Sequence, residues 1–286
     1  MNGILITARP DLQVNRRLLE AAEALGLRMR LLDGTQAVAG TEPGPALYPA
    51  PEEPPGVFLA RVGNWRPASM LAVAEALEAA GWRTPNPAAS IRVGRDHWRT
   101  CLALARAEIP VPRTLAGSEP ETLARAAESL GFPVVVKQRR SRMGVGVIRC
   151  LERDHLEAVL DSLWRVGDEV VVQAWVPSEG VSHRLLVTGP RVAAAARFQA
   201  VGDEWRSNAA RGGRASPHRP TPEEERLALR AARALGLGIC GVDILPSPSG
   251  PVVVEVNPTP GFRHLEAATG VDVAAAMARE LLRSRG

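Results

Sequence analysis

The stretch GVDILPSPSGPVVVEVNP, residues 241–258, reads as two short apolar strands joined by a turn rich in proline, serine and glycine. Such a turn predicts an antiparallel hairpin. The expected register places Asp243 opposite Glu255. Asn257 shares a face with Glu255, because alternate residues of a strand point to the same side of a sheet. Three oxygen-bearing side chains therefore converge on one point of the predicted hairpin.

This convergence favours a magnesium site. Two carboxylates that face each other repel unless a cation lies between them, and hard oxygen ligands suit Mg²⁺, whose coordination substrate phosphates would complete. The alternative is a solvated sheet surface with its polar residues outward, and the apolar residues beside each position fit either interpretation. The hairpin alone leaves both open.

A second candidate feature is VVVKQRRSRMGVGV, residues 134–147, in which Lys137 is the only lysine among 35 lysine and arginine residues. Lys137 ends an apolar strand, and backbone amides near Gly144 and Gly146 could lie against an anion in the turn that follows. A compact ammonium that reaches a phosphate would explain why arginine does not stand here. Chance and a plain hairpin turn are the alternatives.

A third feature is the polar loop WRSNAARGGRA, residues 205–215. Arg206, Asn208 and Arg211 lie within six positions beside paired glycines, which offers bidentate donors and a flexible backbone to an anionic group. Arg184, on the expected strand SHRLLV, is a further donor. The alternative is a disordered basic loop.

Composition bounds the class of protein. The chain has 286 residues, 45% of them hydrophobic and 23% charged, which is ordinary globular composition. Its net charge is +4, but acidic residues alternate with the arginines, so nucleic-acid binding is not expected. Three distant cysteines predict reduced, mostly buried thiols. We find no signal peptide and no run of about 18 apolar residues, so a cytoplasmic protein without membrane contact is expected.

Alternation of apolar runs divides the chain into three parts. Residues 1–88 read as strands and helices of a doubly wound α/β unit with a parallel sheet, interrupted by a loop over 40–56 and without a GxGxxG motif. Residues 89–168 read as a small α+β lobe. Residues 169–286 read as a run of strands with two hairpins, followed by a closing helix.

These features, in this order, resemble the ATP-grasp superfamily and, within it, the RimK-type ligases that add glutamate to a carboxyl terminus. The resemblance runs from about residue 86 to the end and is most specific in RSNAARGG, in TPEEERLALRAARALGLGICGVDIL and in VVVEVNPTPGFRHLEAATGVDVA. It implies an α/β fold in which an α/β pre-domain precedes two α+β lobes that enclose ATP.

The resemblance also implies roles for individual residues. Those that would bind ATP are Lys137, Gly144, Gly146, Gln173, Ala174, Trp175, Val176, His183, Arg206, Ser207 and Asn208, with the backbone of residues 173–176 against adenine. Those that would serve the reacting carboxylate and the transferred phosphoryl group are Arg184, Arg206, Asn208 and Arg211. Those that would bind magnesium are Asp243, Glu255 and Asn257.

Three positions depart from the family's pattern. His97 stands where such ligases carry a second ATP-binding lysine, His183 stands where an acidic residue contacts the ribose, and Ala174 replaces a glutamate at the hinge. Recognition of adenine by the backbone would survive the change at Ala174. Loss of the second lysine is more serious, although Arg95 or Arg99 could supply the charge.

The expected activity is an ATP-dependent carboxylate–amine ligase that works through an acyl phosphate. Its cofactors would be ATP and two Mg²⁺ ions, with Mn²⁺ as a possible substitute, and it would act as a homo-oligomer. The acceptor carboxyl group could belong to a protein C-terminus, a peptide or a small molecule. The cations that favour glutamate as the added amino acid are Arg139, Arg140, Arg142, Arg184, Arg211 and Arg263, unless arginine is simply abundant.

Rival activities remain open on the sequence. They are a carrier-protein ligase of the kind found in lysine or arginine biosynthesis, a dipeptide ligase, and a nucleotide-binding regulatory or RNA-binding protein without turnover.

Overall fold

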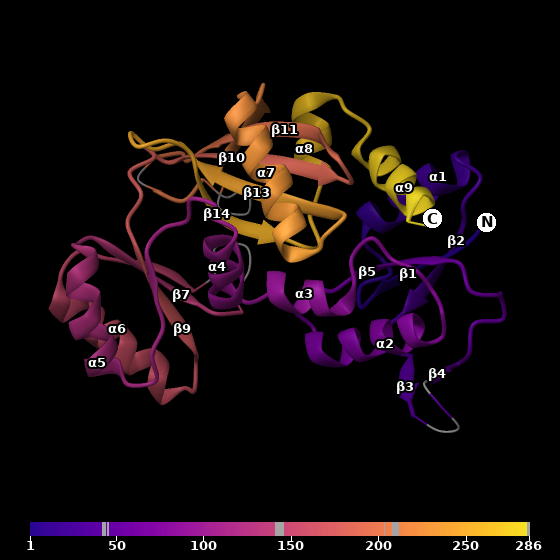
Figure 1. Cartoon of the computed structure of the whole chain (residues 1–286), viewed down its shortest axis with the longest axis horizontal. Helices are drawn as coiled ribbons and strands as arrows, with labels where there is room; N and C mark the ends of the chain where they lie inside the picture. Colours follow the sequence, from indigo (N-terminus) through magenta and orange to yellow (C-terminus); the bar gives the residue numbers. More distant parts are fainter. Residues whose placement is uncertain (42–43, 45, 141–145, 203, 208–211, 285–286) are drawn as a thin grey trace.

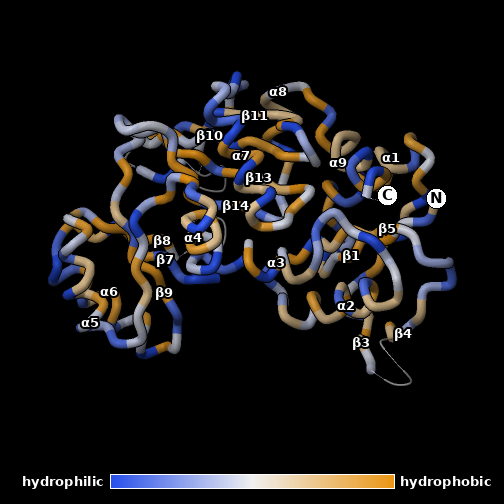
Figure 2. The backbone as a smooth tube through the Cα atoms, viewed as in Figure 1, coloured by the Kyte–Doolittle hydropathy of each residue, from blue (hydrophilic) through white to orange (hydrophobic). Residues whose placement is uncertain are grey.

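The computed structural model shows three lobes joined in sequence order (Figure 1). The residues that it describes are 1–41, 44, 46–140, 146–202, 204–207 and 212–284. Each lobe is built on its own sheet, and the apolar stretches of the backbone follow the strands of these sheets (Figure 2).

The first lobe is a parallel sheet of three strands in the order β2-β1-β5, which confirms the predicted parallel α/β unit. The strands are β1 (Asn2–Thr7), β2 (Arg28–Asp33) and β5 (Val57–Arg61). Helices α1 (Gln13–Ala24) and α2 (Pro67–Ala79) cover its two faces. Residues 3–7 of β1 are fully buried, which is why this strand reads as an uninterrupted apolar run.

The segment expected to be a loop over 40–56 contains part of a short hairpin instead. Strand β3 (Val38–Gly40) pairs with β4 (Ala46–Tyr48) in antiparallel fashion. Each strand has only three residues, too few for an alternating apolar pattern to appear in the sequence.

The second lobe is an antiparallel sheet in the order β6-β9-β7-β8. Its strands are β6 (Thr114–Leu115), β7 (Val134–Gln138), β8 (Val147–Cys150) and β9 (Val170–Ala174). Helices α5 (Pro120–Ala127) and α6 (Arg153–Arg165) pack on it, with the short 3₁₀ helix η1 (Glu128–Leu130) after α5. Strand β9 pairs with β7 and therefore belongs to the second lobe, so this lobe ends one strand later than the expected boundary at 168/169.

The third lobe is an antiparallel sheet in the order β12-β11-β10-β13-β14. Its strands are β10 (Val181–Thr188), β11 (Arg191–Gln199), β12 (Arg214–Pro217), β13 (Ile239–Leu245) and β14 (Val252–Asn257). Helix α7 (Pro222–Leu235) covers one face, and α8 (Arg263–Thr269) and α9 (Val273–Arg283) cover the other.

Two connections hold the lobes together. Helix α3 (Ala88–Gly94) leads into α4 (His97–Arg106). The expected second lobe, residues 89–168, includes α4, but α4 packs against α7 and β14 of the third lobe. Helix α9 returns to pack on α1, so the two termini lie close together (Figure 1). The first and third lobes consequently share one apolar core.

Two expectations from composition can be compared with the structure. All three cysteines are free and buried, as predicted. Within the described ranges, no helix has the length and apolar character needed to cross a membrane.

Candidate active site

The β13–β14 hairpin has the predicted register, with Asp243 directly opposite Glu255. Asn257 pairs with Gly241, two positions along on the same face. The Asn257 side-chain oxygen accepts a hydrogen bond from the Thr259 backbone at 3.0 Å, which fixes its orientation.

Arg184 on the neighbouring strand β10 holds Asp243 through two hydrogen bonds, from Nε at 2.6 Å and from a terminal nitrogen at 2.5 Å. The charge of Asp243 raises the pKa of Arg184. Burial raises the pKa of Asp243, and the charge of Arg184 opposes that rise. The sequence predicted Arg184 as a substrate donor, whereas in the structure its guanidinium neutralises one of the predicted metal ligands.

The three side chains fit a magnesium ion by their chemistry. A carboxylate has about four lone-pair sites, so Asp243 can accept both Arg184 bonds and still bind a cation. Glu255 is half-buried, and its carboxylate accepts no hydrogen bond from any residue that the structure describes. A partly buried carboxylate beside a second one requires a positive partner.

Lys137 approaches these carboxylates from the second lobe. Burial lowers its pKa, and the negative charges of Glu255 and Asp243 act in the opposite direction. It lies at the end of β7, where the three preceding valines are buried and anchor the strand. The structure therefore brings the only lysine to the two carboxylates, although they are more than 100 positions apart in the chain.

A cavity of about 130 Å³ between the second and third lobes collects most of the predicted residues. Those that line it are Lys137, Gln173, Ala174, Trp175, Val176, Arg206, Ser207, Asp243 and Glu255. A larger cavity of about 560 Å³ lies between α4 and the helices of the second lobe, and it contains neither Lys137 nor the two carboxylates. The smaller cavity is therefore the candidate active site.

The predicted adenine segment crosses between the lobes at the edge of this cavity. The buried side chain of Gln173 donates to Thr114 Oγ1 at 2.9 Å and to Cys101 Sγ at 3.3 Å, which ties β9 to β6 and α4. These bonds make Gln173 a support for the segment. The Ala174 backbone N–H donates to the Arg113 oxygen at 2.9 Å, so the other backbone groups of residues 174–176 are the ones that would recognise a base.

Arg206 bridges the lobes on the opposite wall. It donates twice to Glu204, at 2.9 and 2.8 Å, and once to the backbone oxygen of Val147 in β8, at 3.0 Å. The hydrogen bonds from Arg206 lower the pKa of Glu204 to about 2, so Glu204 is ionised at neutral pH. Ser207 donates to Ser182 Oγ at 2.6 Å and anchors the same loop to β10.

Aromatic rings close the cavity beside Arg206. The rings of Trp175 and Trp205 meet edge to face with centroids 5.2 Å apart, and the Arg149 guanidinium lies 5.1 Å and 5.7 Å from their centroids. Such contacts favour a cation over each indole face. They join the adenine segment, the second lobe and the loop of the third lobe.

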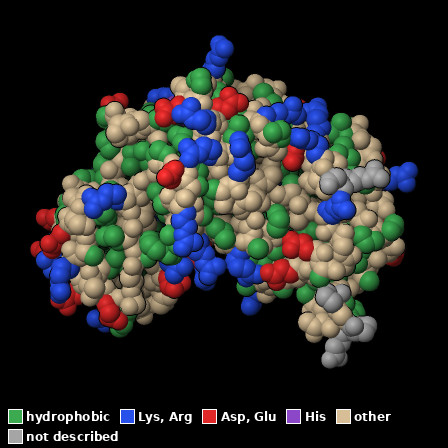
Figure 3. Space-filling model, viewed as in Figure 1, with side chains coloured by type: hydrophobic (Ala, Val, Ile, Leu, Met, Phe, Trp, Pro, Cys, Tyr) green, Lys and Arg blue, Asp and Glu red, His purple; other side chains and the backbone are tan. Residues whose placement is uncertain are grey.

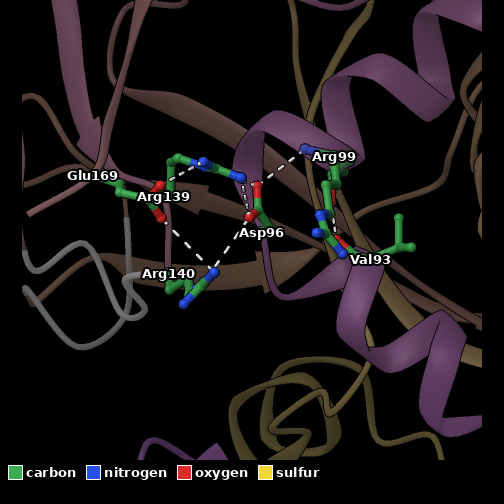
Figure 4. Close-up of polar contacts among 7 residues, drawn as sticks. Val93, Asp96, Arg99, Arg139, Arg140 and Glu169 are labelled. Carbon is green, nitrogen blue, oxygen red and sulfur yellow. Dashed lines mark hydrogen bonds and ion pairs between the residues drawn. The ribbon is translucent and has the colours of Figure 1, made fainter. Parts of the chain in front are cut away.

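The start of α4 is clamped to the end of β7 (Figure 4). Asp96 caps α4 by accepting from the Arg99 backbone at 3.1 Å, and it also binds Arg139 at 2.6 and 3.3 Å. The His97 backbone donates to the Arg139 oxygen at 2.8 Å, and Arg139 further pairs with Glu169 at 3.1 Å. This clamp brings His97 into the cavity wall, where the family's second lysine was expected.

Some predicted residues lie elsewhere. His183 points to the face of β10 opposite Arg184 and binds Glu224 of α7, so the structure does not bring it to the cavity. Asn257 lies beside the cavity and does not line it. Gly146 has φ +68°, a left-handed conformation that favours glycine. The remaining positions, Gly144, Asn208, Arg211 and Arg142, lie outside the described residues.

The sequence missed several residues that line or support the cavity. Ser182 could have been found, because it lies two positions before Arg184 and therefore on the same face of β10. Trp205 precedes Arg206 directly, but a tryptophan in a polar loop carries no signal of its own. Arg149 and Asp96 act through contacts between distant segments, which spacing along the chain cannot reveal.

Fewer arginines are available to a substrate than the sequence suggested. Basic side chains gather around the hollow between the second lobe and the rest of the molecule (Figure 3). Arg139 and Arg184, however, are held by acidic residues of the chain itself. Arg140 and Arg263 are exposed, and Arg140 also faces Asp96 and Glu169 at 4.0 and 3.8 Å.

Comparison with known proteins gives one consistent result. Residues 94–281 match the model of the RimK-like ATP-grasp domain. A "Probable alpha-L-glutamate ligase" of Thioalkalivibrio sulfidiphilus is 36% identical over 279 residues, which is 96% of this chain and 93% of that protein. The crystal structure of a RimK domain protein from Sphaerobacter thermophilus superposes with a TM-score of 0.77 at 28% identity, over 99% of this chain and 100% of that one.

A third similarity concerns the fold alone. The structure of the ATP-grasp ligase PsnB in complex with a minimal precursor, Mg and ADP has a TM-score of 0.74 at 21% identity, over 99% of this chain and 98% of that one.

Proposed function

The chain belongs to the RimK-like ATP-grasp family and is an ATP-dependent ligase, and we propose that it joins glutamate to the carboxyl group of an acceptor through an acyl phosphate. The observation that carries this proposal is the meeting of Lys137 with Asp243 and Glu255 in one cavity between two lobes. Phosphoryl transfer depends on neutralising the charge of the phosphates, which the Lys137 ammonium and a metal held by the two carboxylates would do from opposite sides of the cavity.

The reaction consists of two transfers. An oxygen of the acceptor carboxylate attacks the γ-phosphorus of ATP, and ADP leaves with the electrons of the broken P–O bond. The amine of glutamate then attacks the acyl carbon, inorganic phosphate leaves, and the nitrogen loses a proton to give the amide. Neither transfer needs a nucleophilic side chain, so the protein acts by position and charge.

Within this scheme Lys137 binds the phosphates as a compact positive charge, and the backbone of residues 174–176 holds the adenine ring. Asp243, Glu255 and Asn257 would hold Mg²⁺, which neutralises charge on the transferred phosphoryl group; two ions are proposed, with Mn²⁺ able to substitute. Arg184 orients Asp243 through two hydrogen bonds and opposes the rise of its pKa.

Arg206 acts at the mouth of the cavity. The cavity of about 130 Å³ is smaller than the roughly 300–1,000 Å³ of most ligand pockets. We expect the bond between Arg206 and the Val147 backbone to open when the nucleotide enters, because it joins the two lobes. The released guanidinium can then bind a phosphate or the reacting carboxylate bidentately.

Glutamate is proposed from the name of the relatives. Arg139, Arg140 and Arg184 already face carboxylates of the chain, whereas Arg263 is exposed at the start of α8. The proposed acceptor is a carboxyl group of a protein, a peptide or a small molecule.

A screen for ADP release tests this proposal. The full chain is incubated with ATP, Mg²⁺, one amino acid and a panel of carboxylate acceptors that includes glutamate and glutamate-ended peptides, and products are read by mass spectrometry. We expect glutamate to be preferred over alanine and glutamine by about 1–3 kcal/mol, the cost of leaving a charged partner unpaired. Equal use of neutral and acidic amino acids refutes the choice of glutamate.

Trapping addresses the intermediate separately. With a competent acceptor and no amino acid, hydroxylamine should give a hydroxamate of the acceptor. Glu255→Gln should abolish this product while its circular dichroism stays that of the wild type, because the amide has the shape of the acid but not its charge. Full activity of Glu255→Gln at ordinary magnesium concentrations would assign Glu255 a structural role.

A further inference from the structure

A second group of potential metal ligands lies on the face of the third sheet opposite the active site. It comprises His183 of β10, His218 just after β12, and Glu224 in the first turn of α7, here called the His–Glu cluster. His183 Nδ1 lies 2.5 Å from one Glu224 carboxylate oxygen, and His218 Nε2 lies 3.0 Å from the other. One nitrogen of each ring and a carboxylate oxygen all lie within 4.8 Å of one another.

The cluster is sheltered from solvent, and hydrogen bonds hold the segments that carry His218 and Glu224. The side chains of His183, His218 and Glu224 are 13%, 15% and 5% exposed. The His218 backbone donates to the Ala195 oxygen of β11 at 3.1 Å. Glu224 belongs to a capping box, in which its carboxylate also accepts from the Thr221 backbone at 2.8 Å. Such outer contacts orient a ligand before a metal binds.

The carboxylate of the cluster is in the chemical form that a metal needs. Burial alone would raise the pKa of Glu224, but hydrogen bonds from His183, the Thr221 backbone and His218 outweigh it and lower the pKa to about 2. The carboxylate is therefore ionised at neutral pH. A neutral imidazole binds a metal through its bare nitrogen, and its ring proton moves to the other nitrogen.

The proposed activity does not use this cluster. His183 and Arg184 are neighbours in β10, but alternation along the strand sends Arg184 to the active site and His183 to α7. His183 turns Nδ1 and His218 turns Nε2 toward Glu224, and the two rings stack with their centroids 3.8 Å apart. Two imidazoles and one carboxylate are the ligand set of known three-ligand zinc sites.

We propose that His183, His218 and Glu224 bind one divalent transition metal ion of the zinc class. Imidazole nitrogen selects such ions over Mg²⁺, which takes oxygen ligands. Metal bonds of about 2.0–2.2 Å place tetrahedral ligand atoms roughly 3.3–3.6 Å apart. The ligand atoms already lie within 4.8 Å of one another, and the two stacked rings must tilt apart for their nitrogens to converge on the ion. Water occupies the fourth position. The ion joins β10, the segment after β12 and α7 behind the active site.

The experiment uses the full chain freed of metal and kept in excess Mg²⁺, which occupies oxygen-ligand sites and leaves the cluster to the probe. Co²⁺ is titrated first, because four-coordinate cobalt absorbs visible light far more strongly than the six-coordinate aqueous ion. Zn²⁺ then displaces it. We expect about one Co²⁺ per chain, displacement by an equal amount of Zn²⁺, and a rise in Tm with Zn²⁺.

Variants locate the site. His183→Gln and His218→Gln should each weaken binding by at least about tenfold, because each removes one of three ligands while the glutamine amide can still donate to Glu224. His155→Gln is the matched control, since His155 is exposed on α6 in another lobe, and it should bind as the wild type does.

A mapping experiment keeps the test independent of whether the variants fold. Diethyl pyrocarbonate modifies accessible imidazoles, and mass spectrometry gives the rate at each histidine of the wild-type chain. Zn²⁺ should slow modification of His183 and His218 and leave His155 unchanged. Absence of the cobalt band, undiminished binding by both variants, or equal rates at His183 and His218 with and without Zn²⁺ overturns the proposal.

Discussion

Removal of the Arg184 side chain should expose the cost of a buried carboxylate in the active site. Arg184 and Asp243 form a two-bond pair at 2.6 and 2.5 Å, and their side chains are 24% and 11% exposed. Removing one partner of a fully buried pair costs about 3–5 kcal/mol. Because solvent reaches about a quarter of Arg184, we expect Arg184→Met to lower the free energy of unfolding by about 2–3 kcal/mol, or Tm by about 4–6 °C.

The loss should depend on pH in a defined direction. Burial already raises the pKa of Asp243, and Arg184→Met removes the charge that opposes the rise. A carboxyl group whose pKa is raised on folding binds its proton more tightly in the folded state, so its destabilising effect vanishes below the unfolded pKa of about 3.9 and grows as pH rises toward the folded pKa. The stability difference between wild type and variant should therefore be largest near pH 7–8 and shrink toward pH 4.

Urea unfolding followed by circular dichroism at pH 8, 6 and 4.5 measures this difference. Arg184→Lys keeps a charge without the two-pronged geometry and should lose less than Arg184→Met. Arg125→Met removes an exposed ion pair with Glu121 and should change stability by less than about 0.5 kcal/mol. A loss at Arg184→Met that is equally small, or one that does not change with pH, would show that Arg184 is not the counter-ion of Asp243.

Three further substitutions test the remaining contacts of the site. Lys137→Arg should lower the rate of ADP formation at least about tenfold, or 1.4 kcal/mol, and wild-type turnover would exclude Lys137 as the phosphate ligand. Asp96→Asn keeps the helix cap and loses the charge that binds Arg139, so the free energy of unfolding should fall by about 2 kcal/mol in thermal denaturation. An unchanged Tm would mean that the contact between Asp96 and Arg139 does not stabilise the fold. Glu204→Gln removes a carboxylate whose pKa Arg206 lowers to about 2. Its stabilising effect of about 1 kcal/mol should be complete above pH 5 and fade toward pH 2, and a deficit that persists at pH 2 contradicts the ion pair.

The hairpin at 241–258 shows what local sequence can predict. Its turn chemistry and alternation determined the register, so the opposition of Asp243 and Glu255 followed without knowledge of the rest of the fold. The same holds for Lys137, because the apolar run before it predicts a buried strand and so places the lysine near the end of that strand. Both are properties of segments shorter than 20 residues.

Charge pairing between segments far apart in the chain could not be predicted in this way. Arg184 and Arg139 looked like spare cations, yet each meets a carboxylate that is 59 or 43 positions away in the chain. The position of β9 in the second sheet has the same origin, since its partner β7 is chosen by tertiary packing and not by the residues of β9 alone. His183 was matched to an ATP contact by its place beside Arg184, and strand alternation sends it to the other face.

Transfer of oxygen from the acceptor to phosphate tests the proposed mechanism most directly. Glutamate and a glutamate-ended peptide, each labelled with ¹⁸O in the carboxylates, are supplied as acceptors with ATP and unlabelled glutamate as the amine. Formation of the acyl phosphate bonds a carboxylate oxygen to phosphorus, and the attack of the amine then breaks the bond between that oxygen and the acyl carbon. One ¹⁸O should therefore appear in inorganic phosphate for each amide formed. Amide formation that yields unlabelled phosphate, or that releases AMP and pyrophosphate, would contradict it.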